Sequence, residues 1–314
     1  MLEPITDPMR TQQLPPIPVT SKMRLRRGQL RRLRRTTTQS PQSNYGRLGT
    51  LEVRLALRKS DVKRAQRLRY QVFYQEMSAR PTLTSRIRQL DVDPFDGACD
   101  HLIVEDTAVQ DTRRAFGAPR VVGTYRVLRQ EDAARIGGFY SDHEFDVSRL
   151  IAQRPGERFL ELGRSCVLKP YRNKRTIELL WHGLWTYACA AGVDVMIGCA
   201  SFAGTQPSQH RAALSYLHHY ALAPPPWRTG AHIHRRARLD LLPAAEIDTK
   251  ASLKAMPPLI KAYLRVGAWI GEGAVVDHQF GTTDVLMILP IERIKARYLA
   301  HFGSPEELGG RLAA

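Results

Sequence analysis

Seven residues between positions 69 and 164 are of types, and lie at spacings, that could carry chemistry. They form the patterns Arg69-xxx-Phe73, Asp93-xx-Asp96, a single Arg126 and Glu161-xx-Arg164. An arginine can hold a carboxylate through two parallel hydrogen bonds, and an aspartate can pair with a cation. A glutamate whose pKa approaches the working pH can accept a proton. Together such groups could bind a small charged molecule and remove a proton from it.

Four predicted elements would position these residues. Apolar residues at helical spacing predict a helix from Asp61 to Ser78, with Asp61 as its N-cap, and this helix would carry the first pattern. The second pattern falls in a polar loop, and the others fall in strands predicted over 121–128 and 159–168. Residues three apart in a regular strand face opposite ways, so Glu161 and Arg164 would be separated unless Gly163 forms a bulge. The sequence leaves both arrangements open.

The remaining patterns complete an alternation of strands and helices. Further strands are predicted over 51–56, 101–105, 195–200 and 284–289, and further helices over 146–152, 176–191, 209–220, 258–270 and 291–301. Gly192 would end the long helix as its C-cap. This order predicts an α/β (α+β) fold with a mixed central sheet flanked by helices.

Charge is unevenly distributed along the 314 residues, whose formal net charge is +17. Residues 1–50 contain ten Lys/Arg and two acidic residues. With prolines and few apolar residues to bury, this arm is predicted to be disordered. It is either a solvated tail or a tether to the anionic cytoplasmic membrane surface, where each basic residue contributes about 1 kcal/mol.

Several classes of protein are excluded by composition. No apolar stretch approaches the roughly 20 residues that a membrane-spanning helix needs, and the N-terminus has no apolar signal-peptide core. The four cysteines, at 99, 166, 189 and 199, lack the spacing of a zinc site. We therefore expect a cytoplasmic protein, peripheral on the inner membrane if the arm is a tether, without a bound metal or disulfides.

The joint order of these motifs resembles the autoinducer-synthase branch of the N-acyltransferase (GNAT) superfamily. Longer stretches are more similar to the bacterial ornithine N-acyltransferases of ornithine-lipid synthesis. These stretches are Arg67–Met77, Phe159–Val167, Pro170-Tyr-Arg172, Tyr263-Leu-Arg-Val-Gly267, Asp277-xx-Phe280 and Asp284-Val-Leu286. The resemblance covers about 51–303. It implies a GNAT-like domain over 51–230 and a C-terminal extension, 231–314, that packs on this domain and completes or covers the substrate site.

The resemblance also implies an activity. A 3-hydroxyacyl chain would pass from acyl carrier protein to the α-amino group of ornithine, and the product would be lyso-ornithine lipid. Glu161 would take the amine proton and Arg164 would orient a loop or the carbonyl. Arg69 or Arg126 would hold the substrate carboxylate and the two aspartates of the loop would receive the distal ammonium, with Phe73 also at this site. A backbone amide of the 159–168 strand near Cys166 would stabilise the oxyanion.

Each of these assignments has a structural alternative. Glu161 could instead form a structural ion pair. The loop from Asp93 to Gly97 could simply build turns, for which aspartate and glycine are well suited.

A basic cluster made of Lys169, Arg172, Lys174 and Arg175 precedes the helix predicted from Thr176. The coenzyme-A loop of GNAT enzymes would align here, but both of its small residues are missing. No bound cofactor is therefore expected, and the donor would be the thioester of acyl carrier protein. A helix N-terminus surrounded by basic residues suits the single phosphate of a phosphopantetheine arm and an acidic carrier. An ordinary solvated helix start is the alternative.

Two other functions compete with this interpretation. An acyl-homoserine-lactone synthase would share the motifs, but the tryptophan expected after the first helix is absent from 75–83. A nucleic-acid-binding protein would explain the basic arm, but its basic residues lack interleaved aromatic side chains, so no nucleic-acid partner is expected. A separate O-acyltransferase would act on the product.

Overall fold

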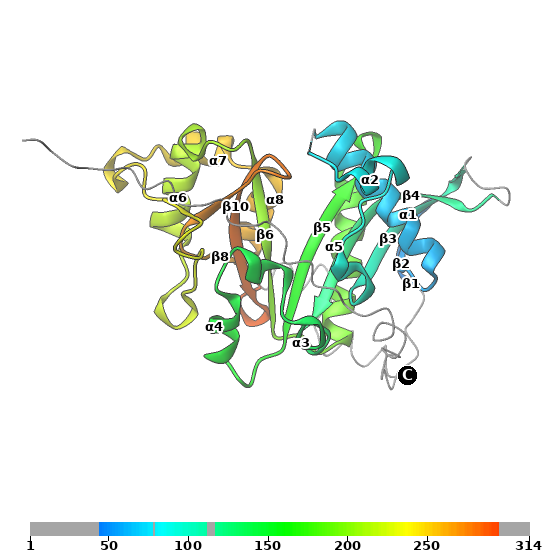
Figure 1. Cartoon of the computed structure of the whole chain (residues 1–314), viewed down its shortest axis with the longest axis horizontal. Coiled ribbons are helices and arrows are strands. Elements are labelled where there is room, and N and C mark those ends of the chain that lie inside the picture. The colour runs from blue at the N-terminus through cyan, green and yellow to red at the C-terminus, as the bar shows by residue number, and fades with distance from the viewer. Residues whose placement is uncertain (1–43, 78, 112–116, 295–314) are drawn as a thin grey trace, which may run out of the picture. The chain divides into compact units, whose positions relative to one another are not determined.

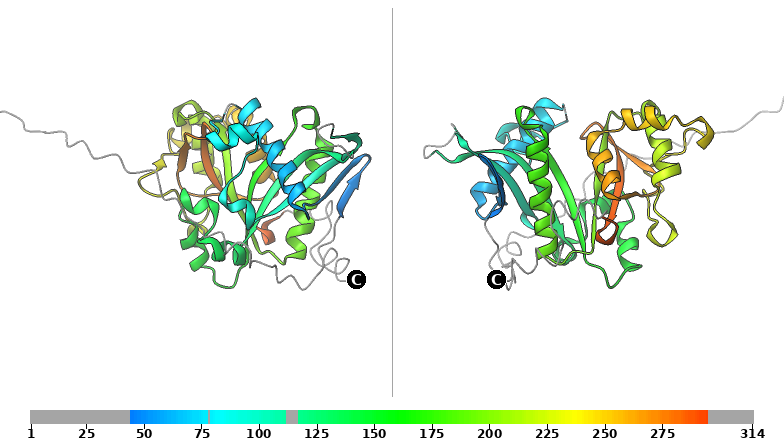
Figure 2. Two further views of the ribbon diagram at one scale, coloured as in Figure 1. Left: turned by 45° about the vertical axis from the view of Figure 1, so that its right-hand side comes forward. Right: turned by 180° about the vertical axis from the view of Figure 1, so that it is seen from behind.

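The computed structural model describes residues 44–77, 79–111 and 117–294. Within these ranges one mixed sheet runs through the molecule in the order β1-β2-β3-β4-β5-β6-β10-β9-β7, and β8 pairs with β10 (Figures 1 and 2). The strands are β1 (Asn44–Leu48), β2 (Leu51–Leu55), β3 (Asp100–Gln110), β4 (Pro119–Arg129), β5 (Phe159–Val167), β6 (Val195–Ala203), β7 (Arg236–Ala237), β8 (Trp269–Ile270), β9 (Ala274–Asp277) and β10 (Thr282–Pro290).

Eight α-helices of the described part surround this sheet. They are α1 (Lys59–Tyr70), α2 (Leu83–Arg88), α3 (Gln130–Ile136), α4 (Val147–Ala152), α5 (Lys174–Ala190), α6 (Arg211–Ala221), α7 (Thr249–Ala255) and α8 (Pro258–Val266). The two views of Figure 2 place α1 and α5 on opposite faces of the first half of the sheet. The predicted mixed α/β sheet flanked by helices is thus confirmed.

Strand β2 shows the alternation of buried and partly exposed side chains that its sequence predicts. Leu51, Val53 and Leu55 are buried and alternate with partly exposed residues, as expected for a strand with one face on the core. Helix α5 packs on this face and has no room for a side chain at Gly183, because a Cβ there would lie only 2.5 Å from the Val53 side chain. Glycine at this position lets the helix approach the sheet closely.

The first helix differs from its prediction at both ends. The helix begins at Lys59, and Arg58 is its N-cap. Asp61 is the third residue of the helix, where its side chain accepts a hydrogen bond of 3.3 Å from the backbone amide of Arg58. A π-helical segment, Gln71–Glu76, follows directly, with the Met77 amide bonded to the Val72 carbonyl. The wider turn carries Phe73, and such π turns often occur at functional sites.

Other differences from the predicted elements are local. Strand β1 lies within the range predicted as arm, and residues 1–43 are outside the described ranges. Helix α5 ends at Ala190 and Gly192 follows with φ +59°, which confirms the predicted glycine stop. Helix α8 ends at Val266 because Gly267 turns the chain at φ +129°. The helix predicted over 291–301 falls mostly outside the described residues.

Strands β5 and β6 are parallel but pair over a short length only. Their register joins Phe159 to Val195 and Glu161 to Ile197, and stops there. Just beyond, a Cβ on Gly198 would lie 2.3 Å from the backbone oxygen of Leu162, so only glycine fits. Because pairing ends at this point, the two strands diverge (Figure 1).

The segment after residue 230 belongs to the same sheet. Strand β10 pairs with β6 along all nine of its residues, from Thr282 to Pro290, and β9 and β7 continue outward from it. The predicted extension therefore forms the second half of the sheet together with β6. None of the helices in the described ranges combines the length and the apolar character needed to cross a bilayer.

Candidate active site

A cavity of about 500 Å³ occupies the gap between β5 and β6. Tyr125 and Arg126 point to opposite faces of β4, yet both line the cavity, so it connects the two faces of the sheet. Residues from α8 and from 277–284 complete its wall. Five of the residues selected from the sequence line it: Phe73, Arg126, Glu161, Arg164 and Arg172.

A bulge in β5 brings the two residues of the last pattern to one side. Opposite β4 the register shifts between Thr124 and Arg126, and Arg164 takes a left-handed backbone conformation with φ +51°. A non-glycine residue in this conformation costs on the order of 1–3 kcal/mol, and such strain is commonly held at functional sites. The sequence allowed this bulge at Gly163, and the structure places the unusual conformation on Arg164.

Three arginines and three aspartates form a buried network beneath the cavity. Arg69 binds Asp91 at 2.7 Å and Asp96 at 2.8 Å. The other two arginines share Asp93, which accepts from Arg164 Nη2 at 2.9 Å and from Arg126 Nη1. Although burial alone would raise it, the guanidinium of Arg69 holds the pKa of Asp96 well below its usual range.

The network contains equal numbers of arginines and aspartates, so its side chains are largely occupied in binding one another. The Arg69 side chain is completely buried and its Nε, Nη1 and Nη2 all donate to Asp91 or Asp96. Arg69, Asp93 and Asp96 do not line the cavity. With each carboxylate paired to an arginine, the loop from Asp93 to Asp96 has no spare negative charge for a bound cation.

Arg126 differs from Arg69 because part of its fork faces the cavity. Its Nη1 makes the contacts to Asp93 and Asp96, whereas its Nε and Nη2 lie 3.8 and 3.7 Å from the position of a Cβ on Gly163. At these distances a Cβ at position 163 would be in ordinary van der Waals contact with the guanidinium, which therefore lies directly against β5. The Tyr140 ring packs against Arg126 at 5.5 Å and against Arg164 at 4.9 Å.

Glu161 is buried and hydrogen-bonded to a turn instead of an arginine. It accepts from the backbone amides of Tyr140 at 2.8 Å and Ser141 at 2.7 Å, and from the Ser141 hydroxyl. Among the described residues, none of the ion pairs involves Glu161. Burial raises its pKa above the ordinary value, while the bonds from Ser141 and Tyr140 oppose the rise. A cavity-lining carboxylate with a raised pKa suits proton transfer.

All four residues of the predicted basic cluster are exposed, and they stand at the start of α5, which Asn173 caps. Arg172 lines the cavity, and its guanidinium donates to the Val167 carbonyl at 2.8 Å and to Glu76 at 2.5 Å. Lys169, Lys174 and Arg175 lie outside the cavity lining. The cluster therefore adjoins the cavity through Arg172.

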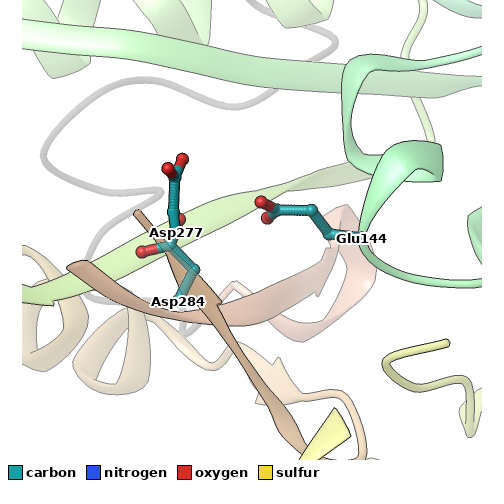
Figure 3. Close-up of side chains that lie close together, drawn as sticks. All are labelled: Glu144, Asp277 and Asp284. Carbon is teal, nitrogen blue, oxygen red and sulfur yellow. The ribbon is translucent and has the colours of Figure 1, made fainter. Parts of the chain in front are cut away.

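A second carboxylate group is made of Glu144, Asp277 and Asp284; sequence reasoning placed the two aspartates in family-like stretches but assigned no role to any of the three. Each can present an oxygen within 4.8 Å of the others, and Figure 3 shows the Glu144 side chain directed toward the two aspartates. Asp277 and Asp284 line the cavity. The available signal was Asp284, an acidic residue inside the otherwise apolar strand sequence that ends at Leu289.

Burial raises the pKa of two of these carboxyl groups, Asp284 and Glu144. Burial raises the pKa of Asp284 to about 6, and the charge of Asp277 acts in the same direction. Burial, together with the charge of Asp284, raises the pKa of Glu144 to about 7. Burial likewise raises the pKa of Cys166 and of Cys199, so both thiols stay protonated at neutral pH.

The variant Asp284→Asn should gain stability relative to the wild type as pH rises from about 4 to 7. A carboxyl whose folded-state pKa is raised from 3.8 to about 6 stabilises the fold at low pH, and this contribution is lost as pH rises through 6. The full difference is about 3 kcal/mol, since one pKa unit corresponds to about 1.4 kcal/mol. Urea unfolding of both proteins across this pH range measures it.

Comparison of two proteins isolates Asp284 from other titrating groups. Burial lowers the pKa of His101 to about 4, which gives the opposite slope, but it does so equally in both proteins. Asp240→Asn is the matched control, because Asp240 is exposed and pairs with Arg238 on the surface. Parallel stability curves for Asp284→Asn and wild type would show that Asp284 is not perturbed by burial.

Comparison with known proteins places this architecture in a family. Residues 68–182 match the model of the acetyltransferase (GNAT) domain, as the resemblance implied. An L-ornithine N(alpha)-acyltransferase of Agrobacterium fabrum is 49% identical over 274 residues, which are 87% of this chain and 92% of that protein. The protein of the same name from Brucella abortus is 51% identical over 82% of this chain and 91% of its own.

Among solved structures, an N-acyl amino acid synthase from uncultured soil microbes superposes with a TM-score of 0.42 at 10% identity, covering 77% of this chain and 91% of that one. The two ornithine acyltransferases are about 50% identical to this chain over about nine-tenths of their own length, which is sufficient to assign the chain to their family. The protein is an acyltransferase, and the chain belongs to the L-ornithine N(alpha)-acyltransferase family.

Proposed function

We propose that this protein transfers a 3-hydroxyacyl group from the thioester of acyl carrier protein to the α-amino group of ornithine. The observation that carries the proposal is the cavity between β5 and β6, whose lining brings the carboxylate of Glu161 together with Arg126 and Arg164. The relatives named L-ornithine N(alpha)-acyltransferase support ornithine as the acceptor. The acyl group and its carrier are inferred from the sequence resemblance and from the basic cluster.

The reaction is aminolysis of a thioester. The α-amino nitrogen attacks the thioester carbonyl carbon, a C–N bond forms, the C–S bond breaks and the thiol leaves. An α-amine has a pKa of about 8, so most of it is protonated at neutral pH and must lose a proton before attack. Glu161 accepts this proton, directly or through water, and returns it to the leaving thiolate. The arrangement requires the ionised form of Glu161.

The acceptor carboxylate is held by Arg126. Its Nε and Nη2 face the cavity beside Gly163, while Nη1 is fixed by Asp93 and Asp96. A guanidinium held on one side by carboxylates and open on the other presents a rigid fork to an anion. Arg69 is completely buried and does not line the cavity, so it acts instead by positioning Asp91 and Asp96.

The thioester carbonyl lies against β5 beyond Glu161. The pairing with β6 ends at Glu161, and residues 162–167 of β5 line the cavity, so this segment is the source of the backbone amides that would contact the carbonyl oxygen. Backbone amides in a site that excludes water stabilise a developing oxyanion strongly. Apolar cavity residues such as Val72, Met77 and Leu259 provide surface for the acyl chain.

The basic cluster, Lys169, Arg172, Lys174 and Arg175, receives the carrier. All four side chains are exposed, and Arg172 lies at the cavity, where a phosphopantetheine arm would enter. Complementary charge mainly accelerates encounter and fixes the partner. The product is amphiphilic, which fits work at the cytoplasmic membrane face, and its free 3-hydroxyl is the group that a separate O-acyltransferase would use.

Reversing charge in this cluster should weaken use of the carrier selectively. In the double variant Arg172→Glu and Arg175→Glu, we expect the KM for acyl carrier protein to rise several-fold, with the KM for ornithine unchanged, because only the carrier is repelled. The control variant Lys250→Glu and Lys254→Glu places the same charges on α7. Steady-state kinetics against each substrate measure both constants. Equal effects of the two double variants would remove the docking role.

The proposal is tested by incubating the purified protein with 3-hydroxyacyl carrier protein and a panel of amino acids, and identifying products by mass spectrometry. We expect N-acylornithine as the main product. Parallel reactions contain 3-hydroxyacyl coenzyme A as donor and S-adenosylmethionine as acceptor. Absence of any acylated amino acid with either donor would overturn the proposal, and a product from S-adenosylmethionine alone would assign the chain to lactone synthesis.

A further inference from the structure

We propose that Glu144, Asp277 and Asp284 form the site that binds the distal ammonium group of the acceptor and thereby selects a diamino acid. This inference rests on the proposed function, because it assigns a second contact to the same acceptor. The loop aspartates Asp93 and Asp96, which the sequence favoured for this role, are paired with Arg69, Arg126 and Arg164.

Sheet register brings this acidic group to the face that carries the base. Ile197 pairs with Glu161 across β5 and β6, and Cys199 and Ser201 follow Ile197 at two-residue spacing, so all of them face the same way. Ser201 pairs with Asp284 across β6 and β10, and Thr282 pairs with Asp277 across β10 and β9. Cross-strand partners lie on one face. The acidic group and Glu161 therefore share one side of the sheet.

Cys199 shows that the two groups are close. Its Sγ donates to Glu144 at 3.5 Å, and burial together with the charges of Glu144, Asp284 and Glu161 raises its pKa. A single side chain thus lies within the electrostatic reach of both the proposed base and the acidic group. An acceptor molecule spanning Cys199 can present one nitrogen to each.

The negative charges of the acidic group are only partly balanced by nearby basic side chains. In the described residues its ion pairing is limited to Arg235, whose Nη2 lies 3.6 Å from Glu144 Oε1. Asp277 accepts from the backbone amides of Gln279 and Phe280 through Oδ1 alone. Three carboxylates with one guanidinium form a negative site inside a protein whose net charge is +17.

Two buried polar atoms without a partner point to a missing ligand. The Oγ1 of Thr282 and the Oδ1 of Asp284 are both buried and make no hydrogen bond to the described residues. Both residues are more than nine-tenths buried and both line the cavity. Leaving such groups unsatisfied is costly, so native structures normally provide a partner. Thr282 is not one of the three carboxylates, and its buried hydroxyl, which meets no partner in hydrogen-bond geometry, lies beside Asp284 and faces the same site.

An alkylammonium group matches these acceptors. It carries three N–H donors and one positive charge, and the site offers carboxylate oxygens and a hydroxyl around one point. A divalent cation is the other ligand that three carboxylates could take. The position in the wall of the acceptor cavity, beside Glu161, favours the ammonium of the acceptor itself.

The test compares ornithine with norvaline, which has the same carbon skeleton without the distal ammonium. With saturating acyl donor, wild-type kcat/KM should favour ornithine by at least about tenfold, as expected for charge-assisted hydrogen bonds. In Asp284→Asn the KM for ornithine should rise at least about tenfold. The rate with norvaline should not fall, and the KM for the donor should not rise. Asp277→Asn is a second variant with the same expected pattern.

Control reactions distinguish an ammonium site from a metal site and from a general effect of removing a carboxylate. Asp240→Asn, which removes an exposed carboxylate, should keep the preference for ornithine. Retention of the preference in both Asp284→Asn and Asp277→Asn would overturn the assignment, as would equal use of ornithine and norvaline by the wild type. Loss of the preference on adding EDTA would assign the group to a metal ion instead. These outcomes overturn the ammonium site without affecting the proposed function, which is overturned only if no amino acid is acylated.

Discussion

Replacing Glu161 by glutamine is expected to lower kcat by a factor of about 10² or more, while the KM for each substrate changes little. The amide cannot take the proton that the α-amine must lose, whereas it keeps nearly the same shape in the cavity. Steady-state kinetics with ornithine and the acyl carrier thioester measure the loss. The acid-side fall of the wild-type pH profile, which reports protonation of the base, should be absent from the variant.

Glu161 also holds the turn at Tyr140 and Ser141, so the variant needs a control for position. Ser141→Ala removes the hydroxyl bond to Glu161 but leaves both backbone amides in place. If Glu161 acts only by holding this turn, Ser141→Ala and Glu161→Gln should be impaired to a similar, small degree and both should keep the wild-type pH profile. A Glu161→Gln enzyme with a near wild-type rate contradicts the role as base.

Replacing Arg69 by methionine is expected to reduce the free energy of unfolding by about 3–5 kcal/mol, because it leaves Asp91 and Asp96 buried without their main counter-charge. Methionine fills most of the space, so the loss reports charge and not a cavity. Urea denaturation followed by circular dichroism measures the change. Asp96→Asn in the same background should recover part of the stability, since it removes one of the stranded charges.

Arg238→Met is the matched control for this experiment. Arg238 pairs with Asp240 at 3.0 Å, but its side chain is 73% exposed, and such exposed pairs contribute little to stability. An Arg69→Met protein as stable as Arg238→Met would show that the network beneath the cavity does not support the fold. Such a result would also return Arg69 to consideration as a substrate-binding residue.

The pH-dependent stability of Asp284→Asn and its acceptor selectivity bear on the same residue in different ways. A residue that exists only to hold the fold together should lower stability when replaced. Asp284 is expected to do the opposite at neutral pH, since its carboxylate is buried near Asp277 and Glu144. Groups that reduce stability in this way are characteristic of binding sites that await an opposite charge.

Local structure and family could both be predicted from the order of the residues alone. Alternating apolar residues predicted β2, helical spacing predicted α5, and Gly192 marked its end. These features depend on near neighbours in the chain, for which side-chain periodicity and backbone preference are sufficient. The motifs around Arg69 and Glu161 also identified the acyltransferase family, because a family preserves residue types at short spacings.

Which charges are already paired and which remain free depends on how distant parts of the chain come together. Arg69 and Asp96 are 27 positions apart, and the structure pairs them with each other away from the cavity lining. Glu144 and Asp284 are far apart in the chain, and they meet because β10 enters the sheet beside β6, out of chain order. Strand alternation tells which face a side chain takes but not which strand will lie next to it, so a buried ion pair or an unpaired carboxylate appears only once the sheet is assembled.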